Sequence, residues 1–190
     1  MAKVYEFLAN GFEDVEALAP LDILRRGGVE VVTVSITASN AVESAHGVTV
    51  IADTHISDVD LSDADMLVLP GGMPGAKNLL EHEALCQALV EHNNEGKLVA
   101  AICAAPMVLG QNGLLEGKNA TCYPGFEHLL TGANYTAELV TVDGNITTGR
   151  GPGAAMEFGY QLLARFVPEE QVQALRDGMI YSDLLNCRGE

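Results

Sequence analysis

The sequence predicts an α/β protein with a doubly wound, mostly parallel sheet that is covered by helices on both faces. Three observations predict this class. Short apolar runs alternate with helix-like stretches along the chain. Two of these runs end directly in distinctive turns, at Pro70-Gly71-Gly72 and at Cys103. The 190 residues include 48% hydrophobic residues, enough for one sizeable core. Because no repeat, low-complexity stretch or linker divides the chain, we expect a single domain over residues 1–190.

The expected elements of the first half of the chain alternate between strand and helix. A helix over 13–26 has acids in its first turn, Arg25 and Arg26 in its last, and Gly27-Gly28 to end it. A connection over 43–47 leads into 48–52, which suits a hairpin or edge pair. The other expected elements are strands over 4–9, 31–35 and 65–69 and an amphipathic helix over 83–93.

The second half continues the same alternation. A strand over 97–102 runs into Cys103 and then into a helix that reaches about residue 109. Pro152 suits the first position of a helix that ends at 166. The tail from residue 178 receives no assignment. The other expected elements are short strands over 118–121, 138–142 and 145–148, with a turn at Asp143-Gly144, and a short helix over 168–177.

Composition excludes several classes of function. The net charge of −16 would repel phosphate backbones and anionic membranes, so we expect no nucleic-acid or membrane partner. No apolar run approaches the ~18–20 residues of a membrane span, and the N-terminus has no signal peptide, which indicates a cytoplasmic protein. We therefore interpret the cysteines as reduced thiols. They are widely spaced, so we expect no metal and no cofactor: Cys86, Cys103, Cys122 and Cys187.

The strongest chemical signal is the strand that ends at Cys103 and is followed by Ala104, Ala105 and Pro106. Small residues after a strand-end cysteine are typical of a nucleophile elbow, in which a sharp turn presents the side chain above the sheet. The positive end of a helix dipole favours the thiolate, so we expect the pKa of Cys103 to fall below the ~8.5 of a free cysteine. The alternative is a buried structural cysteine, since free cysteines are often buried.

Two further features fit a site at the carboxyl ends of the strands. The glycine-rich turn at Gly71-Gly72 can turn backbone N–H groups toward a developing oxyanion, although an ordinary strand-to-helix turn has the same composition. Pro20 lies four residues after Glu16, and a kink there would aim Glu16 toward the strand ends. By position alone, however, Glu16 is better explained as a solvated helix acid beside Glu13 and Asp14.

The remaining candidates carry weaker signals. Cys122 lies beside Tyr123-Pro124 in an expected loop and is the competitor of Cys103 as the reactive thiol. The histidines share no spacing, none directly follows Cys103, and each is best explained as a surface residue. They are His46, His55, His82, His92 and His128.

Taken together, these motifs resemble the ThiJ/PfpI superfamily and, within it, the branch named after DJ-1. The resemblance covers nearly the whole chain. It rests on the order of four segments, which read LANGFEDVE over 8–16, LPGG over 69–72, AAICAAP over 100–106 and GRGPG over 149–153.

The resemblance implies a flavodoxin-like α/β/α sandwich and a homodimer. It makes Cys103 an oxidation-prone nucleophile and Glu16 a protonated acid hydrogen-bonded to that sulfur. Gly72 and Ala104 match amides that donate to an oxyanion. Arg26 and His46 match basic groups near the pocket.

The chain departs from the family pattern at two positions. Tyr123 stands where many members of the branch have a histidine. Ala104 stands where the peptidase-like branch has a histidine after the cysteine. Both departures argue against a Cys-His dyad and against efficient peptidase activity, unless His128 reaches the site from the following loop.

The resemblance also implies a function. Relatives convert methylglyoxal or glyoxal to hydroxy acids without a cofactor, or remove early glycation adducts from proteins. We therefore expect an enzyme of the glyoxalase III or deglycase type, with small aldehydes or glycated proteins as substrates. The alternative is a redox sensor or stress chaperone that works through oxidation of Cys103.

Overall fold

The structure is a computed structural model that describes residues 2–186. A seven-stranded sheet forms its centre. The strands are β1 (Lys3–Leu8), β2 (Glu30–Ser35), β5 (Thr54–His55), β6 (Met66–Leu69), β7 (Leu98–Ile102), β10 (Val140–Asp143) and β11 (Ile146–Gly149). Their order is β10-β11-β7-β6-β1-β2-β5, and every neighbouring pair is parallel except β10 with β11. The predicted doubly wound, mostly parallel sheet is therefore confirmed.

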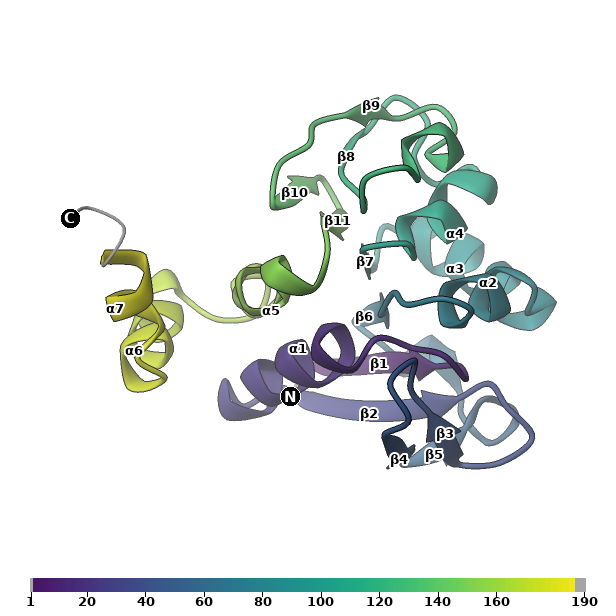
Figure 1. The fold of residues 1–190 in the computed structure, drawn as a ribbon, viewed down its shortest axis with the longest axis horizontal. Helices are drawn as coiled ribbons and strands as arrows, with labels where there is room; N and C mark the ends of the chain where they lie inside the picture. The colour runs from purple at the N-terminus through teal and green to yellow at the C-terminus, as the bar shows by residue number, and fades with distance from the viewer. Residues whose placement is uncertain (1, 187–190) are drawn as a thin grey trace.

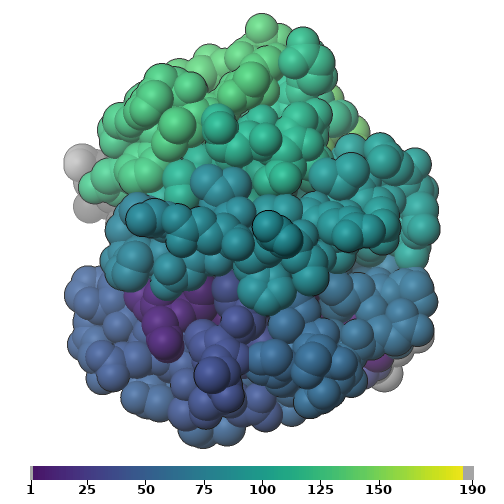
Figure 2. Space-filling model, turned by 90° about the vertical axis from the view of Figure 1, so that its right-hand side faces the viewer, coloured from purple at the N-terminus to yellow at the C-terminus, as the bar shows by residue number. Residues whose placement is uncertain are grey.

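Helices cover both faces of the sheet (Figure 1). One face carries α1 (Asp14–Arg26), α5 (Ala155–Leu163), α6 (Glu169–Gly178) and α7 (Tyr181–Asn186). The other carries α2 (Gly75–Leu80), α3 (Glu83–Asn94) and α4 (Pro106–Gln111). This second face looks toward the viewer in Figure 2, where the teal residues of these helices lie between green residues above and blue residues below.

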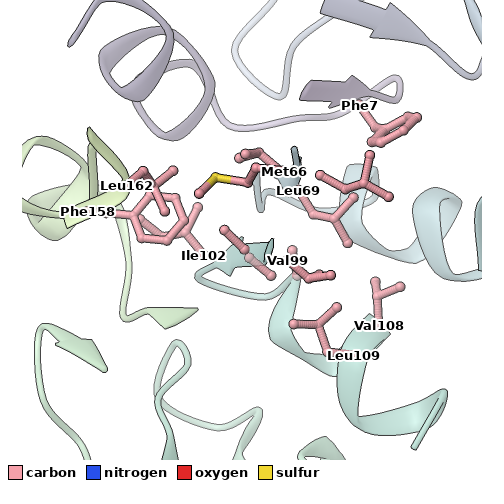
Figure 3. Packing of buried hydrophobic residues seen from close by; sticks show 14 of the residues in the cluster. Phe7, Met66, Leu69, Val99, Ile102, Val108, Leu109, Phe158 and Leu162 are labelled. Carbon is pink, nitrogen blue, oxygen red and sulfur yellow. The ribbon is translucent and has the colours of Figure 1, made fainter. Parts of the chain in front are cut away.

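The core fills the space between each helical layer and the sheet, as Figure 3 shows. Phe158 and Leu162 of α5 point toward Ile102 of β7 from one side, and Val108 and Leu109 of α4 lie on the other. All five side chains are fully buried. The central strands are apolar on both sides because helices cover both faces, which is why their sequences lack polar alternation.

Two smaller pairs of strands lie outside the main sheet. The predicted hairpin is present as β3 (Ala41–Glu43) and β4 (Thr49–Ile51), which pair antiparallel. Its apolar side packs on Phe12 and Ala17, at the start of α1. The second pair, β8 (Asn119–Ala120) and β9 (Asn134–Tyr135), is parallel, and β9 was not expected from the sequence.

Most predicted elements are present within one to three residues of their expected ends. The helix expected over 152–166 begins with a 3-10 turn, Pro152–Ala154, and its α-helical part ends at Leu163. Two helices were missed: α2, which follows the glycine-rich turn, and α7, in the unassigned tail. Within residues 2–186, no helix combines the length and the apolar composition that crossing a bilayer requires.

Candidate active site

Three strand ends meet where the sheet changes its winding direction. From β1 the chain goes to β2 on one side, and the following strands β6, β7 and β11 add on the other. The connections after β1, β6 and β7 contain Glu16, Gly71-Gly72 and Cys103 respectively. Ligands of open α/β sheets bind beyond the carboxyl ends of the strands at such a switch point. The topology therefore brings the predicted motifs to one place.

Cys103 occupies a sharp turn between β7 and α4. Its φ is +65°, a left-handed conformation that residues other than glycine seldom adopt and that stores backbone strain. Hydrogen bonds hold both sides of the turn: the Cys103 N–H donates to the Gly149 carbonyl, and the Tyr123 N–H donates to the Cys103 carbonyl, each at 2.8 Å. Because the neighbouring elements fix this strained turn, the thiol is presented in one orientation above the sheet. The sharp strand-to-helix turn predicted at Cys103 is present.

The glycine-rich turn after β6 is packed directly against the thiol. A Cβ on Gly71 would lie 2.5 Å from Glu16 Oε2 and 2.7 Å from Cys103 Cβ, so only glycine fits there. Gly72 has a φ of +86°, and its backbone N–H donates toward the Cys103 sulfur. The Ala104 N–H donates toward the same sulfur. These two donors are suited to stabilise negative charge that develops at or next to the sulfur.

Glu16 is completely buried, although its position in the sequence favours a solvated helix acid. It lies in the first turn of α1, and the Glu13 N–H bonded to the Gly71 carbonyl ties that turn to the end of β6. Its Oε2 accepts the Gly71 N–H at 3.1 Å, while Oε1 has no conventional hydrogen-bond partner. Burial raises the pKa of Glu16 to about 7, and the interaction with the Cys103 thiol partly offsets this rise. The carboxyl group can therefore hold a proton at neutral pH.

The pKa of the Cys103 thiol is raised, so the expectation of a lowered pKa is wrong. Burial is the main cause, and the charge of the adjacent Glu16 carboxylate adds to it. The N–H groups of Gly72 and Ala104 lower the pKa but do not outweigh these effects. The helix dipole favours the thiolate, but burial and the nearby Glu16 outweigh it. Protonation of Glu16 removes the second of these effects, so the Cys103 thiol loses its proton more readily when Glu16 carries one.

A cavity of about 420 Å³ opens above the thiol. The thiol is only 7% exposed, so reagents reach the sulfur through this cavity. Its lining residues come from the β1–α1 connection, the β3–β4 hairpin, the two strand-end turns, the segment after β8 and the start of α5: Glu13, Ala45, His46, Gly72, Met73, Cys103, Ala104, Tyr123, Phe126 and Pro152.

His46, at the tip of the β3–β4 hairpin, is near the pocket as the resemblance implies. Its Nδ1 lies 2.6 Å from Asp14 Oδ2, and this contact raises the pKa of His46. Ligand atoms of Glu13, Asp14 and His46 lie within 4.8 Å of one another, close enough for one cation to contact all three. The spacing in the sequence did not suggest this cluster. Within it, Glu13 already accepts the Glu16 N–H as the helix cap, and Asp14 pairs with His46.

The other predicted residues are placed as follows. Arg26 is at the opposite end of α1, where it pairs with Asp22, so the structure does not bring it to the cavity. Tyr123 lines the cavity and is 45% exposed. His128 lies in the 3-10 turn Glu127–Leu129 and is absent from the lining.

Of the other cysteines, Cys122 is fully buried, and burial raises its pKa and that of Cys86. Cys187 lies outside the described residues.

Sequence reasoning missed several residues of the site. Met73, Phe126 and Pro152 form much of the cavity wall, and Gly71 donates to Glu16. Met73 could have been found, because it directly follows the glycine-rich turn. Phe126 could not, because only the path of the loop after β8 brings it to the switch point.

Comparisons with known proteins agree with this arrangement. The DJ-1/PfpI family model matches residues 2–165. Two Arabidopsis thaliana proteins, DJ-1 homologs B and A, are 42% and 41% identical over 89% and 86% of this chain. The chain spans only 39% and 43% of their lengths. Drosophila melanogaster protein dj-1beta is 35% identical over 91% of this chain and 94% of its own.

Solved structures give the same result. Oxidized Toxoplasma gondii DJ-1 has a TM-score of 0.91 and 37% identity, over 95% of this chain and 98% of its own. Drosophila melanogaster DJ-1beta has a TM-score of 0.90 and 34% identity, over 94% and 97%. The expected flavodoxin-like sandwich is thereby confirmed. With its match to the family model over most of its length, this chain belongs to the DJ-1/PfpI family.

Proposed function

We propose that the protein is a cofactor-independent enzyme that converts reactive 2-oxoaldehydes to 2-hydroxy acids through Cys103. One observation carries the proposal: a strained, buried thiol is in contact with a carboxyl group of pKa about 7, beneath an open cavity. A nucleophile next to an acid that can gain and lose a proton at neutral pH is what such a conversion requires.

The proposed reaction begins with attack of the Cys103 sulfur on the aldehyde carbon. Glu16 takes the thiol proton and gives it to the aldehyde oxygen, and the product is a hemithioacetal. The Glu16 carboxylate then takes the proton from the former aldehyde carbon and returns it to the neighbouring ketone carbon, while the hydroxyl proton of the hemithioacetal passes to the ketone oxygen. The result is a thioester of the 2-hydroxy acid. Water hydrolyses the thioester and regenerates the thiol. The net change is addition of one water molecule, so no external oxidant or reductant is needed. Gly72 and Ala104 stabilise the charge on oxygen in each addition step.

Deglycation is a variant of the same chemistry. An early adduct of an amine or thiol with a 2-oxoaldehyde still contains the two adjacent carbons that the reaction uses. Release of the amine or thiol as the Cys103 sulfur adds would lead to the same hemithioacetal. Met73 and Tyr123 line the cavity and are exposed, which supports the entry of such an adduct from solvent.

The test is turnover of methylglyoxal by purified protein without glutathione, followed as lactate formed per mole of protein. We expect many turnovers per active site and none with Cys103→Ser. Consumption of aldehyde that stops at one equivalent, with no hydroxy acid, would overturn the proposal.

A redox sensor or stress chaperone is the second candidate, because the oxidized state named for the Toxoplasma gondii relative indicates that a DJ-1 can be oxidized. In this role, peroxide oxidises the Cys103 thiolate to a sulfinate, and protonated Glu16 donates a hydrogen bond to the product. Stoichiometric gain of two oxygen atoms at Cys103, in a protein without aldehyde turnover, would favour the sensor.

We also propose that the protein is a homodimer and acts in the cytoplasm. Apolar side chains are exposed on α1 and on the neighbouring segment 48–51, which contains β4, and they support a dimer face: Val15, Leu18, Val48 and Ile51. The free cysteines support a reducing compartment. Light scattering should give about 40 kDa, twice the 20.1 kDa chain. Val15→Asp should shift this mass toward the monomer, whereas the similarly exposed Val142→Asp should not.

A further inference from the structure

The cavity above Cys103 has a mostly apolar wall. Met73, Tyr123, Phe126 and Pro152 surround the opening, with Ala45 beside them. Met73 and Tyr123 remain 48% and 45% exposed, so their side chains are accessible to a ligand in the cavity. A volume of about 420 Å³ is in the range of pockets that hold ligands much larger than a three-carbon aldehyde. Methylglyoxal would leave most of this wall in contact with water.

Tyr123 separates this cavity from a second one of about 410 Å³, and both cavities share Pro152. The ring packs on Gly151, where an added Cβ would lie 3.1 Å from Tyr123 Cδ2. The backbone N–H of Tyr123 is bonded to the Cys103 carbonyl, which ties the backbone of Tyr123 to the turn that holds the thiol. The second cavity adds Pro124 and Leu139 to the apolar surface, with Arg150 as its charged residue. The two cavities therefore adjoin at Tyr123 and Pro152.

The charged side of the cavity is already occupied. The Glu13 carboxylate caps α1, and the His46 ring is paired with Asp14. Each of these groups already has a partner within the chain, and the apolar wall is the larger part of the lining that a substrate can contact.

We propose that the site prefers aldehydes with an aromatic or bulky apolar substituent, such as arylglyoxals, over methylglyoxal. This inference deepens the proposed function and rests on it for the reaction. The aldehyde carbon reaches Cys103 while the substituent packs on Tyr123, Phe126 and Met73. One extra methylene group in a hydrophobic pocket changes kcat/KM by about 10–200-fold.

Turnover provides the first test. Rates for phenylglyoxal and methylglyoxal are compared after division by their reactivity with a small thiol in solution. We expect kcat/KM to favour phenylglyoxal by about tenfold or more. Tyr123→Ala and Phe126→Ala should each lower the ratio of kcat/KM for phenylglyoxal to kcat/KM for methylglyoxal to near one. Tyr135→Ala is the matched control, because Tyr135 is an exposed tyrosine (38%) outside both cavities. Equal values for the two substrates in the unaltered protein would overturn the proposal.

Alkylation provides a test that does not depend on turnover. Iodoacetamide and N-phenyl iodoacetamide modify the same sulfur, and their rates at Cys103 are compared with their rates on glutathione. We expect the phenyl reagent to gain about tenfold at Cys103, with saturation kinetics, and to lose this gain in Tyr123→Ala but not in Tyr135→Ala. If no aldehyde is turned over but this selectivity holds, the proposed reaction fails while the apolar pocket stands. A ratio near one in the unaltered protein would overturn the pocket itself.

Discussion

Two buried glutamates, Glu16 and Glu6, show how differently the same group behaves in two regions of this molecule. Glu16 is at the carboxyl end of the sheet and Glu6 is in the middle of β1, where it is 2% exposed. Each has an Oε1 without a hydrogen-bond partner. Burial raises the pKa of both carboxyl groups, well above the usual range for Glu6, where Arg25 in α1 offsets the rise only in part.

The two carboxyl groups differ in whether a cavity and a nucleophile lie next to them. Glu6 lies between Thr33 of β2 and Val68 of β6 in register, and it lines neither the cavity above Cys103 nor the one that adjoins it. Glu16 has the Gly71 N–H on one oxygen and the Cys103 thiol beside it. The comparison teaches that burial alone produces a neutral acid. A catalytic acid also needs a nucleophile in contact and a cavity that admits a substrate.

The largest effect should come from removing the nucleophile. Cys103→Ser should lower aldehyde turnover by at least about 1000-fold, because a serine hydroxyl without a base is a poor nucleophile. Cys86→Ser and Cys122→Ser serve as controls and should retain turnover within about twofold. Initial rates of hydroxy acid formation measure all three variants. Retained activity in Cys103→Ser would place the chemistry elsewhere.

The two glutamates can be compared directly by substituting each with glutamine. Glu16→Gln should lower turnover by about 100-fold or more, because the amide cannot transfer the proton. Glu6→Gln should leave turnover within about twofold. The measurement is kcat at saturating aldehyde for both variants, with thermal unfolding to verify that each is folded. Equal losses at the two positions would mean that Glu16 acts through the fold alone.

For the free energy of unfolding, unlike turnover, we expect the substitution of Glu6 to have the larger effect. A carboxyl group whose pKa is raised by folding stabilises the protein below its unfolded pKa of about 4.3, and this contribution is lost as pH rises through the folded pKa. The free energy of unfolding should therefore fall as pH rises from about 4.5 to beyond 7, with contributions from both glutamates. Glu6→Val should flatten this fall and stabilise the protein at pH 8 by about 1–3 kcal/mol, because it removes a buried group without a partner. Urea unfolding at several pH values measures the effect, and an unchanged profile would mean that Glu6 is neutralised by another group.

The smallest effect concerns the reactivity of the thiol. The Glu16 carboxylate raises the pKa of Cys103, so Glu16→Gln should speed alkylation of Cys103 severalfold at pH 8. Glu6→Gln should not change this rate. Peptide mapping after limiting iodoacetamide should also find Cys103 modified before Cys86 and Cys122. First modification at Cys122 would contradict the assignment of the site.

The sequence predicts the sheet well because its buried strands are short apolar runs between clear breaks, as at Gly27-Gly28 and Pro70-Gly71. It also predicts that Cys103 and the glycine-rich turn lie together, since parallel strands place their carboxyl ends at one edge. The local pattern could not predict the burial of Glu16, which depends on how α1 packs, and that role came from the family resemblance. The raised pKa of Cys103 was missed for the same reason: it depends on burial and on a neighbour 87 positions earlier in the chain.

The left-handed turn at Cys103 has a consequence for the evolution of this position. Glycine adopts such a φ without steric strain, so Cys103→Gly would relax the turn and is expected to make the folded state more stable by about 1 kcal/mol. The same substitution removes the sulfur on which the proposed chemistry depends. Selection for stability and selection for activity therefore favour different residues at this position, and a chain that lost its need for the thiol would be expected to lose the cysteine first.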